Sequence, residues 1–190
     1  MALGRAKLAL FRQAHDAFVA AGYRRIGMDH FARPGDELAR ALDTGALHRT
    51  FQGYTTKPAS DLVGLGLTAI SDVQGAFAQN AHTLPSYYAR LRAGRLATER
   101  GHELSADDRL RRTLVEELMC HFSLDLAALP AAGFEPELER LRALEREGLL
   151  VIDGKRLTLT AEGRLFVRNV ARALDAHLST TKAAPFSRTV

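Results

Sequence analysis

Residues 22–71 read GYRRIGMDHFARPGDELARALDTGALHRTFQGYTTKPASDLVGLGLTAIS, and this stretch carries most of the information in the chain. It is dense in polar, aromatic and glycine residues that no helical or strand packing pattern requires. Residues 51–54 fit either a strand or a loop. We expect strands over residues 24–28, 62–66 and 75–79, a loop over residues 29–34 and a helix over residues 36–42.

Helix boundaries are the clearest local signals around this stretch. Apolar residues recur at helical spacing over residues 8–19, until Gly22 stops the helix. Asp36 is a good N-cap for the second helix, and Gly45 is a good residue to end it.

This order of helix, strand, helix and strand is typical of the end of an α/β barrel. In such barrels the catalytic groups lie at the carboxyl ends of the strands. Met28, Asp29 and His30 directly follow the first expected strand and so occupy such a position. A connecting helix is expected around residues 85–93.

The C-terminal half predicts a mostly helical domain with one hairpin. Ser105 and Asp108 have the spacing of a capping box at the start of an amphipathic helix. Residues 153–156 predict a β-turn, and Thr160 caps a last helix. Helices followed by a hairpin and a helix resemble a winged-helix module. The expected fold is therefore α+β or α/β, with domains over residues 1–100 and 101–178 and a loose tail over 179–190.

Composition excludes several classes of protein. Of the 190 residues, 46% are hydrophobic, which suffices for a buried core. No apolar run approaches the roughly 20 residues of a membrane-spanning helix. The net charge of +4 is spread along the chain and does not indicate a nucleic-acid-binding face. The single cysteine fits a reducing compartment, so we expect a cytoplasmic protein without a membrane or nucleic-acid partner.

Three motifs in the central stretch resemble one enzyme family. Residues 27–32 read GMDHFA, residues 51–56 read FQGYTT, and residues 61–71 read DLVGLGLTAIS. Together they closely resemble the C-terminal portion of the oxygen-independent coproporphyrinogen III oxidases of the HemN type, the radical S-adenosylmethionine (SAM) enzymes of haem biosynthesis. That family holds a 4Fe–4S cluster with a CxxxCxxC motif, whereas this chain has one cysteine. The sequence therefore resembles the end of a radical-SAM partial barrel followed by a winged-helix-like domain, with the cluster-binding half elsewhere.

The resemblance implies an activity for the complete enzyme. It would convert coproporphyrinogen III to protoporphyrinogen IX by oxidative decarboxylation of two propionate side chains, using SAM and the 4Fe–4S cluster. This chain would contribute to SAM and substrate binding, with the missing N-terminal radical-SAM half as its partner. Because the cluster ligands are absent, we expect the chain alone to hold no cluster and to be inactive.

The same resemblance assigns SAM contacts to Phe51, Gln52 and Ile70. An aromatic ring can stack on a base or face a sulfonium, and an amide can hydrogen-bond polar ligand atoms. Without the resemblance, FQGYTT would be an ordinary turn and Ile70 a core residue. Asp29 and His30 could bind substrate or support the groups that bind it. In the alternative interpretation, Asp29 caps a loop and His30 is a structural histidine. No residue is singled out as catalytic, and no metal site is expected.

Substrate carboxylates require cationic partners. Four arginines lie near the motifs in sequence, and the sequence does not choose among them: Arg24, Arg25, Arg33 and Arg49. The chain departs from the family at Thr50, where Asn is usual, and at His121, where the family segment reads LMCNF. Neither departure weakens a site assignment much.

Two other functions remain open. One is a haem- or porphyrin-binding accessory protein of the same superfamily; related haem chaperones carry different segments in place of MDHFA and FQGYTT, which favours the oxidase. The other is a winged-helix DNA-binding regulator. Its candidate recognition helix, residues 135–147, holds five glutamates and three arginines, and phosphates would repel it.

Two further motifs are interpreted as structural. Residues 64–69 formally fit a GxGxxA dinucleotide fingerprint, but no acidic residue follows between residues 73 and 98, so nicotinamide and flavin binding are rejected. Cys120 lies beside His121, yet a metal site needs several ligands. We therefore expect Cys120 to be a small buried hydrophobic residue.

Overall fold

The computed structural model describes residues 2–58, 61–130 and 132–177, which form two compact units. The larger unit consists of Met1–Thr56 and Thr113–Val190, and the smaller unit of Lys57–Arg112. Helices and strands are mixed along the chain, and each strand pair of the described residues is antiparallel, so the fold is α+β. These units do not coincide with the expected domains over residues 1–100 and 101–178, whose division stays a prediction. The expected tail lies outside the described residues.

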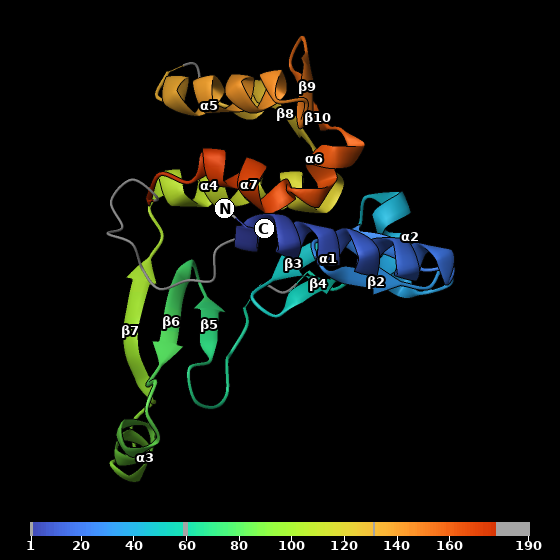
Figure 1. Ribbon diagram of the computed structural model, residues 1–190. Helices are drawn as coiled ribbons and strands as arrows, with labels where there is room; N and C mark the ends of the chain where they lie inside the picture. The colour runs from blue at the N-terminus through green and yellow to red at the C-terminus, as the bar shows by residue number, and fades with distance from the viewer. Residues whose placement is uncertain (1, 59–60, 131, 178–190) are drawn as a thin grey trace. The chain divides into compact units, whose positions relative to one another are not determined.

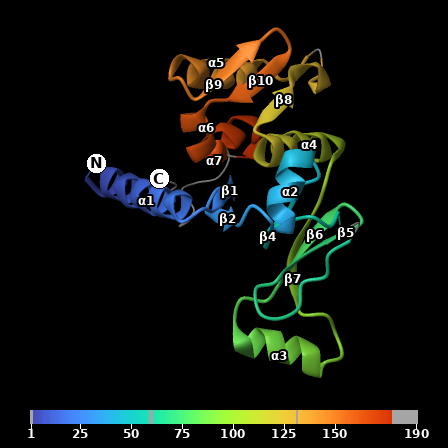
Figure 2. The same ribbon diagram turned by 90° about the vertical axis from the view of Figure 1, so that its right-hand side faces the viewer.

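The first segment of the larger unit contains two short hairpins and two helices. Its elements are α1 (Ala2–Ala20), β1 (Arg24–Gly27), β2 (His30–Ala32), α2 (Glu37–Thr44), β3 (His48–Thr50) and β4 (Gly53–Thr55). Figure 2 shows α1 and α2 beside β1, β2 and β4. β1 pairs with β2, and β3 pairs with β4. The first expected strand is confirmed as β1. The loop expected over residues 29–34 is wrong, because a left-handed Met28 (φ 47°) turns the chain back into β2.

Both ends of α2 follow their sequence signals. The Asp36 carboxylate accepts a hydrogen bond of 2.9 Å from the Leu38 backbone N–H, and Gly45 ends the helix with a φ of 68°. The helix packs both hairpins against the end of helix α4 (Ala106–His121). The buried residues of this core are Ile26, Ala32, Ala39, Ala41, Leu47, Tyr54 and Cys120.

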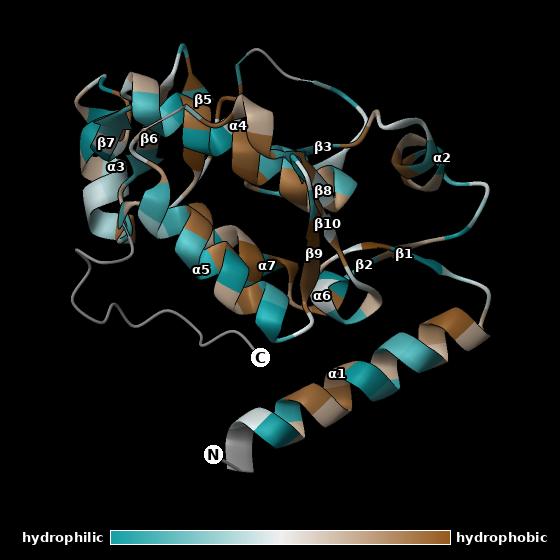
Figure 3. Ribbon diagram, turned by 90° about the horizontal axis from the view of Figure 1, so that it is seen from above, coloured by the Kyte–Doolittle hydropathy of each residue, from teal (hydrophilic) through white to brown (hydrophobic). Residues whose placement is uncertain are grey.

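The second segment of the larger unit folds around a sheet of strand order β8–β10–β9. After α4, its elements are β8 (Ser123–Asp125), η1 (Leu126–Ala128), α5 (Glu135–Arg146), β9 (Leu150–Asp153), β10 (Arg156–Leu159), α6 (Ala161–Leu165), α7 (Val167–Ala171) and η2 (Arg172–Leu174). Figure 3 shows hydrophobic and hydrophilic residues alternating along α5, as in an amphipathic helix. The turn expected over residues 153–156 is confirmed by the β9–β10 pair. β8 was not expected, and the last helix is interrupted at Phe166.

The smaller unit is a three-stranded sheet with one helix (Figure 1). Its elements are β5 (Ile70–Val73), β6 (Ala76–Asn80), α3 (Leu84–Arg92) and β7 (Thr98–Glu103). The strand expected over residues 75–79 is confirmed as β6, and the helix around 85–93 as α3. The strand expected over residues 62–66 is wrong, since only Leu62 forms an isolated bridge, with Asp72. Positive φ angles at Gly66 (101°) and Thr68 (60°) break this apolar run.

Two further helix caps are confirmed. The Ser105 hydroxyl accepts a 3.1 Å hydrogen bond from the Asp108 N–H, and the Ser105 N–H donates a 3.0 Å bond to the Asp108 carboxylate, which is a capping box. The Thr160 hydroxyl accepts a 3.0 Å bond from the Gly163 N–H. Among the described helices, none is both long and apolar enough to span a bilayer.

Candidate functional site

The β3–β4 hairpin displays Phe51 and Gln52 on its two-residue turn. Thr50 pairs with Gly53 across the hairpin, which leaves the two predicted SAM contacts outside the ladder. The Phe51 side chain is 51% exposed, and Gln52 is also exposed. Gly53 makes this turn possible with a φ of 139°, a conformation that residues with a side chain rarely adopt.

Thr50 fixes the backbone of this turn. Its hydroxyl accepts a hydrogen bond from the Gln52 backbone N–H at 3.2 Å and lies 3.2 Å from the Gln52 side-chain oxygen. This contact orients the amide by its oxygen and leaves the side-chain nitrogen of Gln52 to donate to a ligand. Thr50 therefore supplies a polar side chain where the resembling family has Asn.

Asp29 and His30 lie at the neighbouring hairpin turn, between β1 and β2. The His30 Nδ1 is 3.0 Å from a carboxylate oxygen of Asp29, whose side chain is 78% exposed. Arg25 supports the turn, because its Nε donates a 3.1 Å hydrogen bond to the Met28 carbonyl. The pairing register shifts between Arg25 and Gly27, so the bulge re-aims the residues that follow.

The two hairpins meet through His30 and Tyr54. The two rings contact edge to face, with centroids 5.2 Å apart. A Cβ added to Gly53 would lie 2.5 Å from His30 Nε2, so the imidazole packs directly against the strand that follows Phe51 and Gln52. The structure thus brings Asp29 and His30 beside the Phe51–Gln52 turn.

Tyr54 anchors this arrangement in the core. Its hydroxyl donates a 3.0 Å hydrogen bond to the Met119 carbonyl, and burial raises the pKa of Tyr54 to about 12. A Cβ added to Gly27 would overlap with the Tyr54 hydroxyl, so glycine is required for this close approach. Tyr54 is neutral at ordinary pH and acts as a structural support for His30.

Ile70 lies in the smaller unit, as the first residue of β5, and is half-buried. A Cβ added to Gly64 would lie 2.7 Å from the Ile70 carbonyl oxygen, so Gly64 permits a close backbone approach at this position. The structure brings Phe51 and Gln52 together. Because Ile70 belongs to the other compact unit, convergence of all three side chains stays a prediction.

Two more residues belong to this site: Arg49, one of the four candidate arginines of the sequence, and Tyr54, which the sequence did not single out. They pair across the hairpin, with the Arg49 guanidinium 5.7 Å from the Tyr54 ring centroid. The Arg49 Nε is buried without a hydrogen-bond partner among the described residues. An unsatisfied buried donor costs about 1–3 kcal/mol and calls for an explanation. The sequence signal for Tyr54 is its place within FQGYTT, and that for Arg49 is its positive charge two residues before this motif.

Cys120 is fully buried in the core of the larger unit. Burial raises the pKa of its thiol to about 12, with a further contribution from Glu116. The thiol is therefore protonated and inaccessible, which is unsuitable for metal binding. The expectation that Cys120 is a small buried hydrophobic residue is confirmed.

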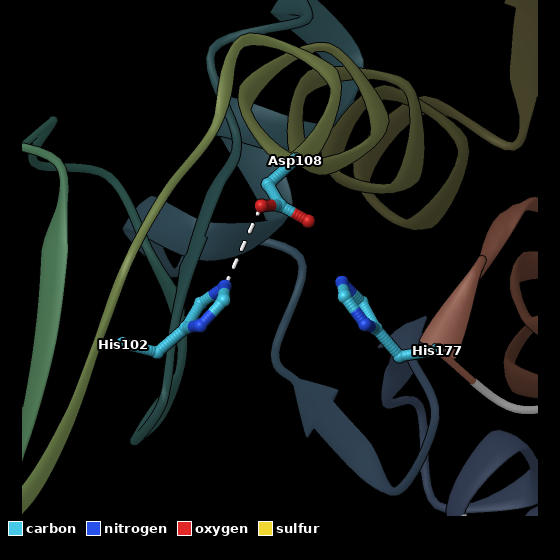
Figure 4. Close-up of side chains that lie close together, drawn as sticks. All are labelled: His102, Asp108 and His177. Atoms are coloured by element: carbon cyan, nitrogen blue, oxygen red, sulfur yellow. Dashed lines mark ion pairs between the residues drawn. The ribbon is translucent and has the colours of Figure 1, made fainter. Parts of the chain in front are cut away.

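A histidine–aspartate pair lies in the smaller unit (Figure 4). The His102 Nε2 is 3.4 Å from a carboxylate oxygen of Asp108, which also accepts a 2.7 Å hydrogen bond from the Ser105 hydroxyl. The carboxylate thus serves the capping box of α4. His177, the third side chain drawn, is part of the larger unit.

A shallow groove of about 680 Å³ lies along α5, between that helix and the α7–η2 segment. None of the predicted site residues lines it, and its charged residues are of both signs: Glu137, Arg140, Arg172 and Asp175. Glu137 is buried and forms a 2.8 Å ion pair with Arg140. The groove is therefore not uniformly basic. The expectation that the chain binds no nucleic acid stays a prediction.

Known proteins match this chain over almost its whole length. Residues 104–166 match the family model of the HemN C-terminal domain. The chain is 43% identical over 192 residues to the oxygen-independent coproporphyrinogen III oxidase of Thermostichus vulcanus, and 40% identical over 194 residues to that of Pseudomonas aeruginosa. Each match covers 97% of this chain, but 59% and 42% of the respective relative.

A solved structure gives the same result. It is described as coproporphyrinogen III oxidase (HemN) from Escherichia coli, a radical SAM enzyme, and it matches with a TM-score of 0.84 and 41% identity. The match covers 90% of this chain and 41% of the other. In fold and sequence the chain is thus similar to part of a radical SAM enzyme. The chain is a homologue of the C-terminal part of the oxygen-independent coproporphyrinogen III oxidases.

Proposed function

We propose that the chain supplies SAM and substrate contacts to an enzyme that converts coproporphyrinogen III to protoporphyrinogen IX. The observation that carries this proposal is the Phe51–Gln52 turn, held open to solvent by Gly53 and Thr50 and flanked by Asp29 and His30. The chain spans 59% and 42% of the two relatives compared, so the activity of the whole enzyme is inferred from them.

The residues of the turn fit SAM. Phe51 presents an exposed ring that can stack on the adenine or face the sulfonium, and Gln52 is bonded to Thr50 through its side-chain oxygen, which leaves the amide nitrogen to donate to a ligand. We infer that Ile70 adds an apolar contact from the smaller unit. When bound, SAM would supply radical chemistry for hydrogen abstraction, with one electron delivered by a reduced cluster held outside this chain. The residues of this chain would bind and orient SAM and the substrate. Asp29 and His30 would contact polar substrate atoms.

The residues of this chain do not fit a 4Fe–4S cluster. Such clusters are held by several thiolates, whereas this chain has one cysteine. That thiol is fully buried, and its pKa is raised to about 12. We propose that the cluster of the working enzyme is ligated by residues outside this chain.

The isolated chain is expected to incorporate no cluster. Anaerobic reconstitution with iron and sulfide, followed by desalting and metal analysis, should give well below one cluster per chain. The Cys120→Ser variant, which removes the only thiol, should give the same iron content as the unmodified chain. Stoichiometric cluster in the unmodified chain would contradict this assignment.

We further infer that residues 101–178 are a winged-helix-like domain and that residues 1–100 correspond to the end of the SAM barrel. The order α4, β8, α5, β9 and β10, with strand order β8–β10–β9, supports the first inference. The mixed charge of α5 favours a role in covering substrate over reading DNA.

The proposal is tested by SAM binding to the Gln52→Ala variant. In a ¹⁵N NMR titration of the chain with SAM, we expect shifts at Phe51 and Gln52. Gln52→Ala should weaken SAM binding roughly tenfold, because it removes hydrogen bonds to a charged ligand. The fold should persist, since the side chain is exposed.

A matched control is Gln13→Ala, which truncates an exposed glutamine on α1. It should leave SAM affinity unchanged. An equal loss in the two variants, or shifts confined to other regions, would refute the role of the turn.

A further inference from the structure

The four arginines near the site differ in the groups of the protein that their side chains already bind. Arg24 forms two hydrogen bonds of 2.6 Å with the Asp43 carboxylate, and this pair raises the pKa of Arg24. Arg25 donates to two backbone carbonyls, those of Met28 at 3.1 Å and Arg164 at 2.7 Å. Both guanidinium groups are therefore engaged within the larger unit and serve its structure.

Arg33 and Arg49 have no carboxylate partner among the described residues. Arg33 is exposed, and its guanidinium lies 5.8 Å from the ring centroid of Tyr23, the residue just before β1. Arg49 instead lies on β3, two residues before Phe51. Only Arg49 is therefore both without a carboxylate partner and on the hairpin that carries the turn.

The surroundings of Arg49 hold its guanidinium in place without neutralising it. Its Nη2 is 3.4 Å from the Met28 sulfur, and the group lies over the Tyr54 ring at 5.7 Å. Its Nε is buried and has no partner in the described residues. The nearby Glu116 carboxylate accepts from the Arg49 backbone N–H and pairs with His48, so it does not serve the guanidinium.

We infer that Arg49 binds a ligand carboxylate at the hairpin site, an inference that rests on the proposed function. A planar guanidinium can bind a carboxylate through two parallel hydrogen bonds, and an aromatic ring beneath it, here that of Tyr54, fixes its orientation. Both proposed ligands carry carboxylates: SAM has one on its methionine part, and the porphyrinogen has its propionates. In both cases a ligand carboxylate would bind the Arg49 guanidinium, which the protein already holds in position.

The test measures ligand binding to the full chain and to its Arg49→Ala variant. The ligands are SAM, decarboxylated SAM, coproporphyrin III as the stable oxidised form of the substrate, and the tetramethyl ester of that porphyrin. We expect Arg49→Ala to weaken binding of at least one carboxylate ligand about tenfold or more, because a charge-assisted pair is lost. Binding of the matching ligand without carboxylates should not change.

The pattern of losses identifies the source of the carboxylate. If Arg49→Ala lowers the affinity for SAM but not for decarboxylated SAM, Arg49 binds the carboxylate of the cofactor. If it lowers the affinity for coproporphyrin III but not for its ester, Arg49 binds a carboxylate of the substrate. Arg33→Ala is the matched control and should bind all four ligands normally. Arg49→Lys should recover part of the lost affinity because it keeps the charge.

Two outcomes overturn the inference in distinguishable ways. If the unmodified chain binds SAM or coproporphyrin III and Arg49→Ala binds both equally well, the role of Arg49 is refuted and the proposed function stands. If the unmodified chain binds neither ligand, the proposed function fails and the inference fails with it. Should Arg49→Ala not fold by thermal melting, the comparison of Arg49→Gln with Arg49→Lys decides, since both keep a long side chain.

Discussion

The Gly163→Ala variant is expected to be less stable than the unmodified chain by about 3 kcal/mol. A Cβ at this position would overlap with the Leu149 carbonyl oxygen and lie 2.7 Å from the carbonyl carbon. The obstacle is backbone, so it cannot rotate away. The same carbonyl accepts hydrogen bonds from the N–H (3.1 Å) and hydroxyl (3.2 Å) of Thr160, which fix it against α6.

Urea denaturation followed by far-ultraviolet circular dichroism measures this loss. Gly35→Ala is the control, because nothing lies within 4 Å of the added Cβ and its φ is not in the left-handed region. That variant should stay within about 0.5 kcal/mol of the unmodified chain. A free energy of unfolding for Gly163→Ala within the same margin would contradict the packing of α6 on Leu149.

The Gly53→Ala variant is expected to lose both stability and SAM binding. The residue has a φ of 139°, and the new Cβ would lie 2.5 Å from His30 Nε2. Strain and clash together should cost about 2–4 kcal/mol. Because Gly53 closes the turn, relief of the clash should move Phe51 and Gln52 and weaken SAM binding by more than tenfold. Chemical denaturation and NMR titration measure the two effects.

Gly45→Ala separates the strain from the clash. Gly45 also has a positive φ, 68°, but nothing lies within 4 Å of an added Cβ. It should cost only about 1 kcal/mol, the ordinary cost of a left-handed alanine at a helix end, and should retain SAM affinity. Equal behaviour of Gly45→Ala and Gly53→Ala would show that the His30 contact does not hold the turn.

Local signals predicted the helix ends well. Asp36, Ser105 and Thr160 all cap helices as expected, because a capping side chain bonds to backbone groups two or three residues away. The turn over residues 153–156 was predictable for the same reason. Such interactions are contained in a few consecutive residues, so the sequence displays them directly.

Strand pairing was predicted less well. β7 reads TERGHE and has no apolar alternation, so only its backbone pairing with β6 makes it a strand. The apolar run over residues 62–66 looks like a strand, yet Leu65 is 89% exposed and the ladder does not form. β2 was missed because a methionine at positive φ gives no sequence signal for a turn.

The sequence by itself determined the resemblance to the family and the helix caps, since each depends on neighbouring residues or a contiguous motif. It left residues 51–54 open between a strand and a loop, and the structure made Phe51 and Gln52 an exposed turn. Only the tertiary structure separated the arginines. Asp43 pairs with Arg24 from 19 positions away, and the Arg164 carbonyl engages Arg25 from 139 positions away. Whether an arginine side chain is bound to another group of the protein or can bind a ligand depends on groups that are distant in the chain. Only folding brings those groups together.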